Sequence, residues 1–113
     1  MAGFANVAWG YVGGKQGSRA APVMYFKQTQ SFATSEASST ASTANPLPDL
    51  GSEMVVRIIL NEAGMVAIGS APTAAQGLTA AALAEGGSVR LAANAEAFFA
   101  VGAGDKVAVR DEA

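Results

Sequence analysis

The sequence predicts an all-β protein, a small β-sandwich or jelly-roll-like barrel with an extended N-terminal arm, and three observations predict it. Short runs of β-branched and aromatic residues recur in the second half of the chain at turn-length spacing. Glycine-containing or small polar segments separate these runs. Only residues 73–85 have helical propensity, and Gly77 interrupts them, so a short helix and an irregular loop both stay open there.

Residues 1–19 are punctuated by glycine, with Phe4, Trp9 and Tyr11 interspersed. The glycines disfavour a helix, and the segment lacks the polar alternation of a free-standing strand. Two interpretations are open, an arm that docks on another molecule and a disordered tail. Three aromatic side chains are unusual in a segment that is only solvated, and they favour the arm.

Residues 20–33 are typical of a strand. Val23 and Tyr25 belong to one face, and Met24 and Phe26 to the other. Both faces begin apolar and become polar, which indicates a strand that leaves a core or an interface and emerges into water. Arm and strand together form the first of three expected units, residues 1–32.

The second expected unit, residues 33–50, consists mostly of Ala, Ser and Thr and is closed by Pro46 and Pro48. Such a composition buries too little apolar area to offset its ordering entropy, which predicts a linker or a long loop. A short helix from Ser35 onward is the alternative, although the Ser and Thr content disfavours it.

The third expected unit, residues 51–113, is the folded β-module. Residues 53–61 and 65–69 are two strands, and the turn between them offers Gly64 for a positive φ, which predicts a hairpin. Three more short strands are expected at residues 88–93, 97–101 and 106–110.

The stretch "VGAGDKVAVR", residues 101–110, resembles a phosphate-binding loop at first sight. The Walker spacing is absent, no Ser or Thr follows Lys106, and the loop enters a strand rather than a helix. Gly102 and Gly104 instead suit a tight hairpin turn between two strands, and we favour that interpretation.

The side chains offer little chemistry. The chain has no His and no Cys, which removes imidazole bases, thiolate nucleophiles and the usual zinc sites. Its nine carboxylates stand singly apart from Asp111 and Glu112. We therefore expect no catalytic residue, no cofactor and no metal site, and a protein that is not an enzyme.

Charge and hydropathy limit the classes of partner. The net charge is −2 and the seven basic residues are scattered, which disfavours nucleic acid. The N-terminal residues have neither a basic region nor an unbroken apolar stretch, so we expect no signal peptide, no membrane partner and residence in a cytoplasm. Half of the residues are hydrophobic, but many of these are alanine, and such a thin core predicts oligomerisation.

Two arginines lie in the middle of expected strands, Arg57 and Arg90. They suit either an intersubunit ion pair or a solvent-facing strand position, the second being the commoner case. Because large aromatic side chains dominate interface energetics, the sequence predicts the following interface residues: Phe4, Trp9, Tyr11, Val23, Met24, Tyr25, Phe26, Arg57 and Arg90.

Residues 56–74 and 90–110 resemble small virion proteins encoded among the head genes of tailed bacteriophages. The shared pattern comprises a strand, a strand that ends in "AIG" followed by "APTA", and a C-terminal segment that ends in "VAV". The matching residues are Ala67-Ile68-Gly69, Ala71-Pro72-Thr73-Ala74, Leu91-Ala92, Phe99, Val101, Gly104-Asp105-Lys106 and Val107-Ala108-Val109. Ala93 and Gly102-Ala103 stand where the family usually has glycine or proline turn residues.

The resemblance covers a little over half of the chain and implies a β-sandwich module in a virion. It implies a capsid decoration or cement protein that bridges major capsid protein subunits at the capsid surface, after assembly in the host cytoplasm. Analogy with the family predicts a cyclic homotrimer. The alternative is a head- or tail-fibre component that binds a host surface or a glycan.

Overall fold

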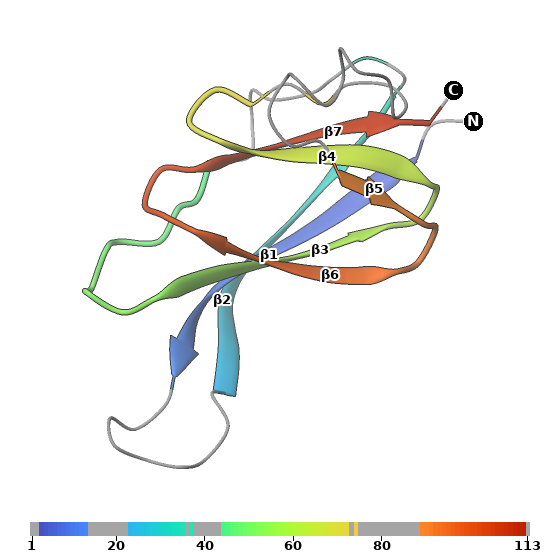
Figure 1. Ribbon diagram of the computed structural model, residues 1–113. Coiled ribbons are helices and arrows are strands. Elements are labelled where there is room, and N and C mark those ends of the chain that lie inside the picture. Colours follow the sequence, from blue (N-terminus) through green and yellow to red (C-terminus); the bar gives the residue numbers. More distant parts are fainter. Residues whose placement is uncertain are drawn as a thin grey trace.

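In the computed structural model, the described residues form seven antiparallel strands in two sheets that pack face to face (Figure 1). The structure describes residues 3–13, 23–35, 37, 44–72, 74 and 89–112. Within these ranges there is no helix, and hence none that is long and apolar enough to cross a bilayer. The expected all-β sandwich is confirmed. The strands are β1 (Phe4–Gly13), β2 (Val23–Ala33), β3 (Met54–Leu60), β4 (Gly64–Gly69), β5 (Val89–Leu91), β6 (Glu96–Val101) and β7 (Lys106–Asp111).

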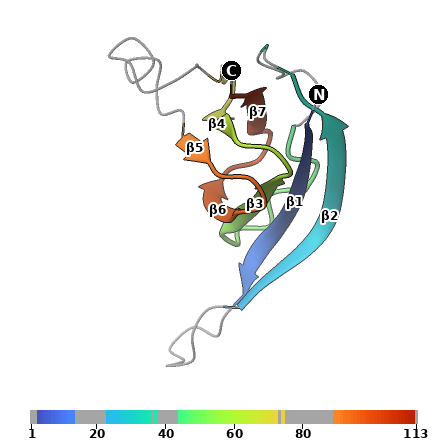
Figure 2. The ribbon, with the colours of Figure 1, turned by 90° about the vertical axis from the view of Figure 1, so that its right-hand side faces the viewer.

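The larger sheet, which we name sheet A, has the strand order β2-β1-β3-β6. The smaller one, sheet B, has the order β5-β4-β7. Figure 2 shows β1 and β2 running together past the remaining strands, so that their Gly13 and Val23 ends project from the body of the sandwich.

The expectation that residues 1–19 contain an arm that docks on another molecule is wrong for strand β1. It lies between β2 and β3 and pairs with both over most of its length. Its odd-numbered residues, Ala5, Val7, Trp9 and Tyr11, all lie in the hydrophobic core. This period of two is what one buried face of a sheet requires, and the expected arm is therefore an inner strand of the chain's own sandwich. Strands β1 and β2 of the expected first unit accordingly share sheet A with β3 and β6 of the expected β-module.

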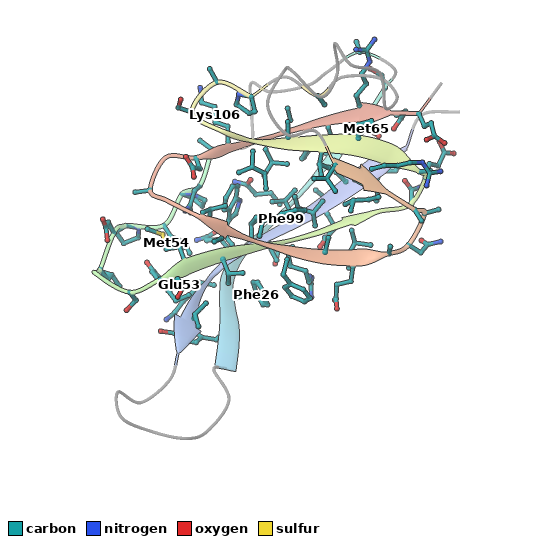
Figure 3. All side chains as sticks on the ribbon, viewed as in Figure 1. Phe26, Glu53, Met54, Met65, Phe99 and Lys106 are labelled. Atoms are coloured by element: carbon teal, nitrogen blue, oxygen red, sulfur yellow. The ribbon has the colours of Figure 1, made fainter. Side chains whose placement is uncertain are left out.

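The core lies between the inner faces of the two sheets. Sheet A contributes Trp9, Val56 and Ile58, all with no exposed surface, and sheet B contributes Val107 and Val109. Figure 3 shows Phe99 between the sheets and Phe26 on the opposite, outer side of sheet A. A second small cluster, formed by Met65, Ala67, Ala74 and Ala108, lies on the outer face of sheet B.

The expected hairpins at Gly64 and at residues 101–110 are wrong, because each connection passes from one sheet to the other. Strand β3 belongs to sheet A and β4 to sheet B, and the same holds for β6 and β7. Gly64 does not have a positive φ; a Cβ there would lie 2.7 Å from the carbonyl oxygen of Arg110. Its lack of a side chain permits close packing of β4 against β7.

The turn within residues 101–110 is confirmed as a turn. Asp105 N donates to Gly102 O at 3.3 Å, and the Asp105 carboxylate accepts from Gly102 N at 2.8 Å. Gly104 occupies the third position with φ 77°, a conformation that favours glycine. Asn94, with φ 63°, has the same place in the turn between β5 and β6. Both turns carry the chain across the sandwich.

The end of the expected linker packs against the sandwich. Asn45 is buried and donates through Nδ2 to Gly102 O at 3.1 Å, while its Oδ1 accepts from Leu47 N at 3.0 Å. These bonds place the Leu47 side chain in the core. Residues 36 and 38–43 of that segment lie outside the described residues. The same holds for residue 73 and residues 75–85, within the range where the sequence left a helix open.

A buried carboxylate ties both ends of the chain together. Asp111, at the end of β7, accepts from the Thr34 hydroxyl at 2.5 Å and from Gly3 N at 3.3 Å. Thr34 N donates to Gly3 O at 2.8 Å, and Asp111 N donates to Ser35 O at 2.7 Å. The start of β1 and the end of β2 in sheet A are thus connected to the end of β7 in sheet B, at one edge of the sandwich.

Candidate interaction surface

The outer face of sheet A carries a cluster of aromatic, polar and charged side chains from all four of its strands. We name this cluster the outer patch, and its members are Asn6, Phe26, Arg57, Glu96 and Phe98. The pairing of the strands explains why these side chains lie together: Arg57 in β3 pairs with Phe98 in β6 on one side and with Ala8 in β1 on the other. Side chains of paired residues lie on the same face, so the outer patch is fixed by the register of the sheet.

Arg57 lies at the centre of the outer patch. Its guanidinium carbon lies 5.4 Å from the ring centre of Phe26, and that ring lies 6.2 Å from the ring of Phe98. A cation–π contact contributes about 0.5–1 kcal/mol at an exposed site, and an aromatic pair about 0.5–1.5 kcal/mol. The two rings and the guanidinium therefore hold one another in place.

Gly10 makes this packing possible. The register shifts by one residue between Trp9 and Gly10, and Lys27 is the extra residue on β2. At this bulge the β2 backbone passes so close to Gly10 that an added Cβ would lie 2.2 Å from Tyr25 O and 2.9 Å from the Phe26 Cα. The absence of a side chain at position 10 lets β2 approach and brings the Phe26 ring over the centre of the sheet.

The guanidinium of Arg57 has more donors than acceptors around it. Nη2 donates to Asn6 Oδ1 at 3.3 Å, and Nη1 lies 3.9 Å from Glu96 Oε2. Its Nε is buried and has no hydrogen-bond partner within the described part of the chain. An unmet buried donor costs about 1–3 kcal/mol.

Arg90 differs from Arg57 in this respect. It lies in β5 of sheet B and donates through Nε and Nη2 to the two carboxylate oxygens of Glu112, the second at 3.0 Å. This hydrogen bonding lowers the pKa of Glu112 and raises the pKa of Arg90. Arg90 is thus engaged within its own chain and lies apart from the outer patch.

The remaining expected interface residues divide between core and surface. Trp9 and Tyr11 are corrections, because both are buried in the core, where Trp9 donates through Nε1 to Gln30 Oε1 at 3.1 Å and Tyr11 donates to Pro48 O at 2.6 Å. Phe4 is exposed, at the start of β1. Val23 and Met24 are described by their backbone alone, and their side chains lie outside the described part.

Tyr25 is exposed on the projecting end of the β1–β2 hairpin. Its ring centre lies 5.9 Å from that of Tyr11, and Lys27 Nζ lies 5.8 Å from it. Tyr25 pairs with Tyr11, which places it on the face opposite to Phe26. Tyr25 therefore lies on the face of sheet A opposite to the outer patch, whereas Phe26 lies within the patch and contacts Arg57.

Three members of the outer patch were missed by sequence reasoning: Asn6, Glu96 and Phe98. A signal for Phe98 exists, because Phe98 and Phe99 are neighbours in one strand and must face opposite sides of the sheet. If one ring is in the core, the other is exposed. No comparable signal exists for Asn6 or Glu96, whose positions depend on which strands are neighbours.

Among the described residues, no three acidic side chains are grouped as a metal site would require. Comparison of the chain with protein-family models, with curated proteins and with solved structures finds no significant match. The arrangement of sheet A is therefore the main physical guide to function.

Proposed function

We propose that this protein is a structural component of a bacteriophage virion, a capsid decoration or cement protein that binds neighbouring coat subunits through the outer patch of sheet A. The observation that carries the proposal is the contact of Phe26, Arg57 and Phe98 on an exposed sheet face. The resemblance of residues 56–74 and 90–110 to small virion proteins supports the viral assignment.

The composition of the outer patch supports binding to a protein. Arginine and aromatic residues are enriched at the centres of protein interfaces, and few such anchors carry most of the binding energy. The Phe98 side chain is 42% exposed on the outer face, whereas the next residue in the same strand, Phe99, packs against the core. A partner that covers the Phe98 ring removes apolar area from water, which stabilises the complex by about 25 cal/mol per Å².

The polar part of the outer patch indicates the chemistry of the partner. Arg57 offers donors, while Glu96, the one carboxylate beside it among the described residues, is half-exposed and 3.9 Å away. Such an exposed ion pair contributes at most about 1 kcal/mol and can be exchanged for another. The matching coat surface would present an apolar side chain to Phe98 and a carboxylate or carbonyl oxygen to Arg57.

The experiment is a binding assay on empty shells of the major capsid protein. A double variant, Phe26→Ala with Phe98→Ala, should bind at least about tenfold more weakly, since truncation of central anchors costs more than about 1 kcal/mol each. The matched control is Leu50→Ala with Val89→Ala, which also removes two exposed apolar side chains, 68% and 41% exposed, away from the outer patch. Equal binding by both double variants would contradict the proposal.

A host-surface or glycan-binding module of a head or tail fibre is the second candidate, and Tyr25 favours it. This ring is 44% exposed on a projecting hairpin and has Lys27 beside it, a combination of aromatic and polar groups that suits a sugar. Tyr25→Ala should then abolish binding to host cells and leave shell binding unchanged. Unchanged binding to host cells would exclude this candidate.

A further inference from the structure

We propose that the free edge of β6 pairs antiparallel with β6 of a second copy of this chain, so that sheet A continues across a two-fold axis. This inference rests on the proposed function for its biological meaning, whereas its test is made on the free chain. The proposed contact gives a two-fold dimer, in place of the cyclic homotrimer that the family analogy predicts.

Within the described part of the chain, both outer edges of sheet A are open. Strand β2 pairs with β1 alone and β6 with β3 alone, and no hydrogen bond of the described residues joins the backbone of either strand to anything else. In sheet B, β5 has only three residues. Strand β7 is bridged at Lys106 by Ala44. Sheet A therefore offers the two edges long enough for strand addition.

The two open edges differ in how well they are protected. Strand β2 has a bulge with Lys27 as the extra residue, and a bulge and a lysine are the devices that block pairing at natural sheet edges. Strand β6 reads Glu-Ala-Phe-Phe-Ala-Val, with no lysine, no proline and no register shift against β3. An apolar edge without protection favours strand addition at β6 rather than at β2.

The residues of β6 complement themselves in one register. A two-fold axis perpendicular to the sheet leaves the outer faces of both copies on the same side. The even-numbered residues of β6 lie on the outer face, so each must oppose an even-numbered residue of the second copy. With Phe98 on the axis, the two Phe98 rings are neighbours on the outer face, and Ala97 opposes Phe99 of the second copy on the inner face. With Phe99 on the axis, two large rings would meet between the sheets, where space is limited. The first register is therefore preferred.

The charges also favour a second copy as the occupant. Glu96 is the only charged residue of β6, and in the preferred register it opposes Ala100 of the second copy, so no like charges face each other. Glu96 keeps its neighbour Arg57 within its own chain. The two outer patches then lie on one continuous sheet face, which doubles the anchors that a pair presents to a partner.

The test uses two variants at Ala100, which is exposed on the outer face next to Phe98. Ala100→Glu places a carboxylate opposite Glu96 of the second copy, twice per pair, and should weaken association about tenfold. Ala100→Lys places an ammonium group there and should leave association unchanged or strengthen it. Position 100 lies diagonally across from Arg57 in the same chain, so the carboxylate does not disturb the fold.

The measurement is molar mass by light scattering over a concentration series. We expect the molar mass of the wild-type chain to rise with concentration from 11.3 kDa to twice that value. The Ala100→Glu variant should need a higher concentration to reach the dimer mass, and the Ala100→Lys variant should not. A wild-type chain that stays monomeric or forms trimers, or two variants with equal effects, would overturn the inference. A monomer that still binds shells would overturn it and leave the proposed function standing.

The register has its own test, because the chain contains no cysteine. Phe98→Cys places one thiol per copy on the two-fold axis and should form a disulfide-linked dimer under mild oxidation. Thr29→Cys, exposed on the same face of sheet A but in β2, should stay unlinked. Equal cross-linking of the two variants would show that collisions, rather than β6 pairing, bring the thiols together, and would count against the inference.

Discussion

Gly10 is the residue on which the close approach of β2 and β1 depends. Its Cβ would lie 2.2 Å from the Tyr25 carbonyl oxygen, so Gly10→Ala should destabilise the fold by about 2 kcal/mol. Gly69→Ala is the matched control, since a Cβ there meets nothing within 4 Å, and it should change stability by less than about 0.5 kcal/mol. Denaturant unfolding monitored by the fluorescence of Trp9, the only tryptophan, measures both. Equal stability of the two variants would contradict the geometry at the bulge.

Glu112 offers a second test at the residue scale, through pH. Its hydrogen bond to Arg90 lowers its pKa in the folded chain, so its stabilising contribution is present above the unfolded pKa and is lost as pH falls through the folded pKa. Arg90→Ala should raise the titration midpoint of the Glu112 carboxyl, and an NMR titration measures that midpoint. The same midpoint in wild type and variant would show that the two side chains are not paired in solution.

The element that decides the architecture is β1. Deleting residues 1–13 removes the strand between β2 and β3 together with Val7, Trp9 and Tyr11 from the core, and we expect the product to lose cooperative unfolding. Removal of residues 1–2 alone leaves the strand intact and is the control. A deletion product that still unfolds cooperatively, by near-UV circular dichroism, would restore the interpretation of this segment as an arm.

Sequence reasoning located the strands of the second half well. The expected strands at residues 97–101 and 106–110 differ from β6 and β7 by one residue at one end each. β-Branched residues and flanking turns sufficed there. In β1 the buried set includes Ala5 and the outward set includes Gly10, so the contrast between the two faces was too weak to identify a strand from composition.

Which strands pair with each other was beyond sequence reasoning. A glycine with positive φ, such as Gly104, serves a hairpin and a turn between two sheets equally well. For the same reason the sequence could name Phe26 and Arg57 as surface residues but could not bring them together. Their contact depends on β1 lying between their strands, a long-range pairing without a local signature.

At the scale of the whole molecule, the two sheets have different surfaces. On the outer face of sheet B, Met65, Ala67 and Ala108 are buried, whereas the outer face of sheet A carries the outer patch with its exposed Phe98 ring. One face of the sandwich thus presents aromatic anchors and an arginine. This asymmetry suits a part that is held on a larger assembly by one side.

The most direct test of the account is cryo-electron microscopy of the virion. We predict density for the sandwich at junctions between coat subunits, with the outer patch of sheet A facing the shell. Density found only on a fibre or at the tail tip, or a shell contact made by sheet B, would contradict the account.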